Sequence, residues 1–176
     1  MKIIGITGRA RSGKDTLANF LVDDHGFLKL SFAAPLRAFV ADITGMTIAE
    51  MEDGPAKEAP LDWLDGKTPR YLMQTVGTEW GREMIDRDLW VKVVENKIRQ
   101  ARREGAAGVV ISDVRFDNEA AFIRQWGGRV VEVVRPGAAA VSAHVSEAGV
   151  SVEHLDGLYV NSGALSELRM YASGLV

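Results

Sequence analysis

A glycine-rich stretch near the N-terminus constrains this chain more than any other feature. Residues 8–14 read Gly-Arg-Ala-Arg-Ser-Gly-Lys and match the pattern G-x-x-x-x-G-K of a phosphate-binding loop. Apolar residues across 3–6 predict a buried strand before the loop, and apolar residues at helical spacing across 17–21 predict a helix after it. Because strand, loop and helix follow in this order, the stretch predicts a nucleotide phosphate site rather than an ordinary glycine-rich turn.

The parts of this loop suit the binding of phosphate. Glycines let the backbone curl so that its N–H groups converge on phosphate oxygens, and the helix N-terminus adds partial positive charge. Lys14 supplies a full positive charge to the phosphate that is transferred. The residues predicted to contact the nucleotide are Gly8, Arg11, Ser12, Gly13, Lys14, Asp15 and Thr16.

One position departs from the usual form of the loop. Asp15 follows Lys14, where most such loops carry the Ser or Thr that ligates magnesium, and Thr16 comes one position later. Either Asp15 holds the hydration shell of the ion, or it mainly complements the helix dipole. The candidate magnesium ligands are Asp15, Thr16 and Asp113.

Length and composition narrow the class of protein. The chain has 176 residues, a formal net charge of −3 and no cysteine. This length predicts one α/β domain, the acidic balance argues against a nucleic-acid partner, and the lack of cysteine excludes a disulfide framework or a thiolate metal site. Since the N-terminus has no signal-peptide layout and no apolar run approaches a membrane span, we expect a cytoplasmic protein with no membrane partner.

Strand and helix patterns alternate along the chain. Strands are expected at 3–6, 27–31, 109–111, 129–134 and near 159–160, and helices after the loop, from Pro35, from Pro69, from Asp88, over 116–126 and over 164–173. This alternation predicts a mostly parallel sheet with helices on both sides. Residues 45–67 are the least regular stretch, with a short helix expected at 48–52, and residues 136–153 are expected to form a small flap. His144 and His154 are not interpreted as a metal pair.

Polar residues gather in the segment after Pro69. Arg70, Gln74 and Thr78 recur every four residues and would share one face if the helix continues through Gly77. The face lacks the alternating Glu and Lys typical of a solvated surface, so we interpret it as a ligand face, with solvation as the alternative. Arg37 lies in the first turn of an earlier helix, where the dipole disfavours a cation, and it either binds an anion or lies in solvent.

Asp113 lies just after the apolar run 109–111, with Ser112 between them. Phosphate-loop enzymes place a carboxylate at the end of such a strand to orient magnesium or an acceptor group. The alternative is a turn aspartate that caps the next helix.

Four motifs in order resemble one family. They are Gly8-x-x-x-Ser12-Gly13-Lys14-Asp15-Thr16, Phe32-Ala-x-Pro35-Leu-Arg37, Gln74-x-x-Gly77-Thr78-Glu79-x-Gly81-Arg82, and Ser112-Asp113-Val114-Arg115-Phe116-x-Asn118-Glu119. As a set, over residues 1 to about 135, they resemble the bacteriophage-type deoxynucleoside monophosphate kinases of the adenylate-kinase-like group. The segment 161–168 also resembles the adenine-side loop and helix of small kinases such as dephospho-coenzyme A kinase.

The resemblance implies a fold and an activity. The fold would be a P-loop kinase domain over 1–176, with a five-stranded parallel sheet in the order 2-3-1-4-5, an acceptor-binding excursion at about 37–90 and a lid at about 136–153. The activity would be transfer of the γ-phosphoryl of ATP to a deoxynucleoside monophosphate, with Mg²⁺. The partner would be the small-molecule substrate, a deoxynucleoside monophosphate, and the protein could form a homodimer.

The resemblance also implies roles for residues. The catalytic residues would be Lys14, Asp113 and Arg115. The donor nucleotide would contact Arg135, Asn161 and Gly163 in addition to the phosphate loop. The acceptor would contact Arg37, Arg70, Gln74, Thr78, Glu79, Arg82 and Trp90. The lid is poor in arginine compared with adenylate kinases, which shifts the task of binding the transferred phosphate to Arg9, Arg11 or Arg135.

Other functions are open. A kinase of the same fold that acts on phosphomevalonate or dephospho-coenzyme A shares the loop, although the segment 74–82 favours a nucleotide acceptor. A nucleotide-binding regulator without turnover is the rival from another class, and the arginines of the acceptor side with Asp113 argue against it.

Overall fold

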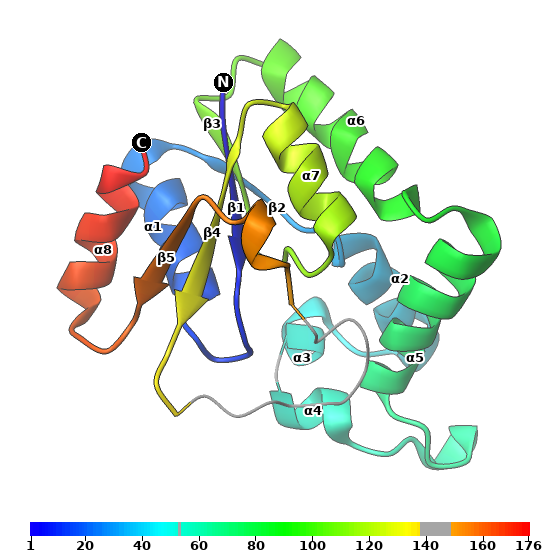
Figure 1. Cartoon of the computed structure of the whole chain (residues 1–176). Helices are drawn as coiled ribbons and strands as arrows, with labels where there is room; N and C mark the ends of the chain where they lie inside the picture. The colour runs from blue at the N-terminus through cyan, green and yellow to red at the C-terminus, as the bar shows by residue number, and fades with distance from the viewer. Residues whose placement is uncertain (53, 138–148) are drawn as a thin grey trace. The chain divides into compact units, whose positions relative to one another are not determined.

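The computed structural model describes residues 1–52, 54–137 and 149–176 (Figure 1). The chain divides into two compact units, of which the first comprises residues 1–32 and 91–176 and the second comprises residues 33–90. Each unit has its own buried side chains and is described separately.

The first unit is built on a five-stranded sheet. Its strands are β1 (Lys2–Thr7), β2 (Leu28–Leu30), β3 (Gly108–Ile111), β4 (Arg129–Val134) and β5 (Gly157–Val160). All neighbouring strands run parallel, in the order β2-β3-β1-β4-β5. The parallel order implied by the resemblance is therefore confirmed.

Short apolar runs form the centre of this sheet. All of β3 is buried, and β1 is buried except for its first residue, as expected for parallel strands that are covered on both faces. A Cβ on Gly108 would lie 2.5 Å from the Phe27 ring, so glycine at that position makes room for the ring to pack on β3.

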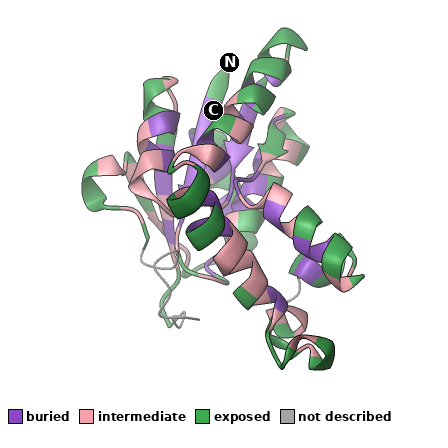
Figure 2. Ribbon diagram, turned by 90° about the vertical axis from the view of Figure 1, so that its right-hand side faces the viewer, coloured by how far each residue is buried: buried purple, intermediate pink, exposed green. Residues whose placement is uncertain are grey.

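Helices cover both faces of the sheet. One face, with Ile4, Ile6 and Val131, packs against α1 (Lys14–His25) and α8 (Leu165–Gly174). On the other face lies α7 (Asp117–Gln125), beside α6 (Leu89–Arg103), which begins in the second unit and belongs to the first from Val91 onward (Figure 1). In Figure 2 buried residues gather along the strands, whereas the outer turns of the helices are exposed. A short helical turn, η4 (Val152–His154), precedes β5.

The second unit is helical. Its elements are α2 (Ala34–Thr44), α3 (Ile48–Glu52), α4 (Gly54–Glu58), η1 (Asp62–Leu64), α5 (Pro69–Thr75) and η2 (Val76–Ile85). Its small core consists of Val40, Ala41 and Met51, against which Met46, Leu72 and Met73 pack. The helix expected at 48–52 is present as α3, and the stretch expected to be irregular also contains α4 and η1.

The segment η2 is a π-helix, so the predicted helix does continue through Gly77 but with a wider turn. Its last backbone bond runs from the N–H of Asp86 to the Gly81 carbonyl, five residues back, at 3.0 Å. The four-residue spacing of the predicted polar face therefore holds between Arg70 and Gln74 in α5, but not on to Thr78, which lies in η2 and is buried.

Trp90 explains how this unusual helix is held. Its indole Nε1 donates to the Gly77 carbonyl at 2.8 Å, and a Cβ on Gly81 would lie 2.6 Å from its ring. Trp90 is 7% exposed. Trp90 thus packs against η2 at two glycines, a role that was not predicted from the sequence.

Among the described residues, no helix is both long and apolar enough to cross a membrane.

Candidate functional site

The phosphate-binding loop connects β1 to α1 and is tightly enclosed at its start. Gly8 has φ +131° and Gly13 has φ +107°, both in the region that favours glycine. A Cβ on Gly8 would lie 2.2 Å from the backbone oxygen of Val133 in β4. Only glycine therefore fits where the loop leaves the sheet.

The end of the loop is held by Asn161, which follows β5. Asn161 Nδ2 donates to the Ser12 carbonyl at 2.8 Å, and the backbone N–H of Asn161 donates to the Val134 carbonyl at 2.7 Å. A Cβ on Gly13 would lie 2.4 Å from Asn161 Nδ2. Asn161 therefore fixes the shape of the phosphate loop. Gly163, in the same connection, would bring a Cβ into contact with the carboxylate of Glu167.

The loop has the features that a phosphate group requires. Lys14 Nζ donates to the Arg9 carbonyl at 2.6 Å, so the lysine folds over its own loop. Among the described residues, no side chain caps the N-terminus of α1, and the buried Ser12 hydroxyl has no hydrogen-bond partner. A helix N-terminus without a cap, next to a lysine and a buried hydroxyl, fits a bound phosphate. Arg11, with φ +61°, and Thr16 lie in the same loop and first turn.

Asp15 lies in a charged network that sequence reasoning missed. It accepts hydrogen bonds from Lys29 Nζ and from Ser112 Oγ, both at 3.0 Å, and Lys29 also donates to Asn19 Oδ1 at 3.1 Å. Burial acts to raise the pKa of Asp15, but the hydrogen bond and charge of Lys29, with smaller effects of Ser112 and Lys14, lower it below its ordinary value of 3.8. Lys29 alternates with leucines in a short strand, a pattern that indicates only a half-buried surface.

Asp113 lies where β3 ends, beside the end of β2. It accepts hydrogen bonds from Ser31 Oγ at 2.6 Å and from the backbone N–H of Phe32 at 3.0 Å. The alternative that Asp113 caps the next helix is wrong, because α7 has Phe116 at its N-cap position. Among the described residues, no group of at least three His, Cys, Asp or Glu could hold a metal ion.

Glu119 ends one of the four motifs, but no role was predicted for it. It is 2% exposed, and its Oε2 accepts from the backbone N–H groups of Arg115 at 2.8 Å and Phe116 at 3.1 Å. The Phe116 side chain cannot accept a hydrogen bond, so only the glutamate half of a capping box is present. A Glu three residues after the N-cap position is the signal that could have indicated it.

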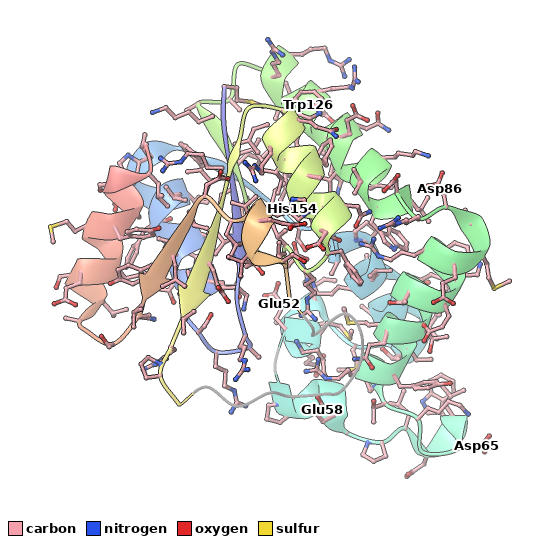
Figure 3. All side chains as sticks on the ribbon, viewed as in Figure 1. Glu52, Glu58, Asp65, Asp86, Trp126 and His154 are labelled. Carbon is pink, nitrogen blue, oxygen red and sulfur yellow. The ribbon has the colours of Figure 1, made fainter. Side chains whose placement is uncertain are left out.

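The predicted acceptor arginines are all in the second unit. Arg37 Nε lies 4.0 Å from Glu52 Oε1, and Arg70 pairs with Glu58; Figure 3 labels both glutamates. Arg82 Nη1 donates to the Arg87 carbonyl at 3.2 Å. Each of the three guanidinium groups thus contacts another residue of this unit.

Other predicted acceptor residues differ in burial. Gln74 Nε2 is buried and has no hydrogen-bond partner among the described residues. Thr78 is buried, Glu79 is exposed, and Trp90 donates its indole proton to Gly77. Gln74 therefore has the strongest structural signal for a ligand contact.

The region predicted as a lid lies largely outside the described residues, as does His144. Arg135, which directly follows β4, is exposed. His154 lies in η4, and its Nε2 is 3.9 Å from the Glu153 carboxylate.

The contact of Asn161 with the loop can be tested by exchanging its donor for an acceptor. Asn161→Asp replaces the N–H with an oxygen facing the Ser12 carbonyl oxygen, whereas Asn161→Ala only removes the bond. We expect Asn161→Ala to lower the free energy of unfolding by about 1 kcal/mol and Asn161→Asp to lower it by about 1 kcal/mol more at pH 7. Denaturant unfolding measures both, and an Asn161→Asp variant as stable as wild type would contradict the donor assignment.

The pair between Asp15 and Lys29 predicts a pH-dependent contribution to stability. The pKa of Asp15 is lower in the folded chain than its ordinary value of 3.8. The pair therefore stabilises the fold at pH values above 3.8, and this stabilisation is lost as the pH falls through the pKa that Asp15 has in the folded chain. Because the Asp15 side chain is 74% exposed, Lys29→Met should lower the free energy of unfolding at pH 7 by less than about 1 kcal/mol. Denaturant titrations from pH 7 downward should show the difference shrinking; a difference that grows on acidification would refute this account.

The chain is similar to known proteins of one family. A family model described as deoxynucleotide monophosphate kinase matches residues 60–171. A relative from Acanthamoeba polyphaga mimivirus, named as a deoxynucleotide monophosphate kinase, is 36% identical over 95% of this chain and 92% of its own length. The deoxynucleotide monophosphate kinase of Enterobacteria phage T4 is 25% identical over 96% of this chain and 95% of its own length.

Solved structures show the same fold at lower identity. Dephospho-CoA kinase from Campylobacter jejuni superposes with a TM-score of 0.52 at 13% identity, covering 99% of this chain and 95% of its own. A sugar kinase from Janibacter sp. superposes with a TM-score of 0.53 at 11% identity, covering 99% and 94%. At these identities the structures indicate the fold alone. The family model and the identity to the viral relatives show that the chain belongs to the deoxynucleotide monophosphate kinase family.

Proposed function

We propose that the protein transfers the γ-phosphoryl group of ATP to a deoxynucleoside 5′-monophosphate, producing a deoxynucleoside diphosphate and ADP. The observation that carries the proposal is the phosphate loop. Lys14 lies there beside the N-terminus of α1, which no side chain of the described residues caps, and the turn admits no larger residue at Gly8. The family of the chain supports a phosphotransferase and a nucleotide acceptor.

The donor side of the proposal uses residues of the first unit. Lys14 and the loop amides would hold the β- and γ-phosphates, and Asn161 would keep the loop in the shape that presents these amides. The adenine would lie toward the connection that contains Gly163, and Arg11 and Arg135 would add positive charge to the phosphate chain.

A magnesium ion would be held mainly by the phosphates of the nucleotide. Magnesium, when bound, neutralises charge on the phosphate oxygens. Thr16 and Asp113 would hold its shell directly or through water. Asp15, like Asp113, already accepts hydrogen bonds, in its case from Lys29 and Ser112, and would contribute to the shell in the same way.

Phosphoryl transfer needs alignment and charge neutralisation more than covalent help. Asp113 would orient the magnesium shell or an acceptor group from a position fixed by its bonds to Ser31 and Phe32. Arg115, two residues on, would stabilise the charge of the phosphoryl group in transfer with its guanidinium.

The acceptor side of the proposal uses the second unit. Arg37, Arg70 and Arg82 would bind the acceptor phosphate, since a guanidinium can hold two oxygens at once. Gln74, Thr78 and Glu79 would contact the base and sugar. Gln74 Nε2 supports a ligand contact most directly, because it is buried without a hydrogen-bond partner among the described residues, and a buried amide group is disfavoured unless a partner is supplied. Trp90 would contribute mainly by holding η2.

The acceptor assignment predicts a selective kinetic effect of Arg70→Ala. Loss of a phosphate-binding guanidinium should raise KM for the deoxynucleoside monophosphate about 10- to 100-fold, corresponding to about 1.4–3 kcal/mol, with KM for ATP nearly unchanged. Steady-state kinetics with each substrate varied in turn measure both values.

Glu58→Gln provides the matched control, because it removes the ion pair of Arg70 while the guanidinium is retained. Its KM for the acceptor should stay close to that of wild type. If Glu58→Gln reproduces the defect of Arg70→Ala, or if Arg70→Ala affects both substrates equally, Arg70 is not the acceptor ligand.

A further inference from the structure

We propose that Glu119 is a positioning residue for phosphoryl transfer, which acts by fixing the backbone of Arg115. This inference rests on the proposed function, in which Arg115 stabilises the transferred phosphoryl group. Glu119 itself is buried under the first turn of α7 and would not contact the substrate.

A buried carboxylate is expensive to maintain unless donors surround it. Glu119 is 2% exposed, and its Oε2 accepts from the N–H groups of Arg115 and Phe116, both in the connection before α7. These groups also lie at a helix N-terminus, which favours negative charge. The Glu119 carboxylate thus binds the backbone of Arg115, whose side chain is proposed to stabilise the transferred phosphoryl group.

Contacts on both sides fix the connection between β3 and α7. The N–H of Val114 donates to the Ile6 carbonyl at 3.2 Å, and the Val114 side chain is 1% exposed. Just before it, Asp113 accepts from Ser31 and Phe32. Glu119 supplies the constraint that follows, at Arg115 and Phe116.

With its backbone held in this way, Arg115 keeps mainly the torsions of its own side chain. Fixing the base of a long side chain lowers the entropy lost when its guanidinium binds a phosphoryl group. A purely structural cap on α7 would affect stability, but it would not act on turnover through Arg115.

The test uses two substitutions of Glu119 in the full-length chain. Glu119→Gln retains an oxygen that can accept both N–H groups, whereas Glu119→Met retains the length of the side chain without an acceptor. We expect Glu119→Met to lower kcat about 100-fold, with KM for ATP and for the acceptor nearly unchanged, and Glu119→Gln to recover most of kcat. Glu95→Gln, at an exposed pair with Arg99, is the control and should leave kcat unchanged.

The double variant Glu119→Met with Arg115→Met separates positioning from folding. If Glu119 acts through Arg115, the double variant should have the kcat of Arg115→Met alone, because the positioned group is already gone. Losses that multiply, or a Glu119→Met variant with the kcat of wild type, would overturn the proposal. Thermal unfolding of every variant shows that each one is folded at the assay temperature.

Amide hydrogen exchange gives a readout that does not depend on turnover. In Glu119→Met, the N–H groups of Arg115 and Phe116 should exchange faster than in wild type, while those in the centre of α7 change less. Unchanged exchange at both positions would overturn the contact on which the proposal depends. A wild-type protein that turns over no acceptor would instead overturn the proposed function, and the exchange rates would still decide whether Glu119 fixes Arg115.

Discussion

Close packing of backbone around the phosphate loop is the constraint on which the rest of the structure depends. At its start the loop touches β4 through Gly8 and Val133, and at its end it is bonded to Asn161 after β5. Both contacts require β4 and β5 to lie in that order beside β1. The strand order therefore determines the shape of the loop, since it brings β4 and the segment after β5 against the loop and fixes its curvature without a ligand.

Polar groups at the carboxyl ends of the strands form a second level of organisation. Asp15 is paired with Lys29, and Asp113 is held by Ser31 and Phe32, so that each carboxylate near the phosphate loop has fixed donors. Compensation of this kind keeps acidic residues close to a site for anions at a smaller electrostatic penalty. It also fixes the directions of these groups before any nucleotide binds.

Features that depend on neighbours in sequence could be predicted, and features that depend on tertiary partners could not. The phosphate loop, the buried strands and the place of Asp113 follow from short patterns, while the strand order came from the family resemblance. The roles of Lys29 and Glu119 were not predicted, because the partners of Lys29 come from α1 and those of Glu119 are backbone N–H groups. The π-helix η2 was missed because helical periodicity reports neither its wider turn nor the packing of Trp90 against its two glycines.

The most direct test of the central claim is ADP release from ATP and Mg²⁺ with different acceptors offered one at a time. The panel would contain each deoxy- and ribonucleoside monophosphate, phosphomevalonate and dephospho-coenzyme A, with Lys14→Ala as the control for loop-dependent turnover. The account predicts turnover with at least one deoxynucleoside monophosphate, and a loss of several orders of magnitude in Lys14→Ala. Turnover with a non-nucleotide acceptor alone, or ATP binding without transfer to any acceptor, would contradict it.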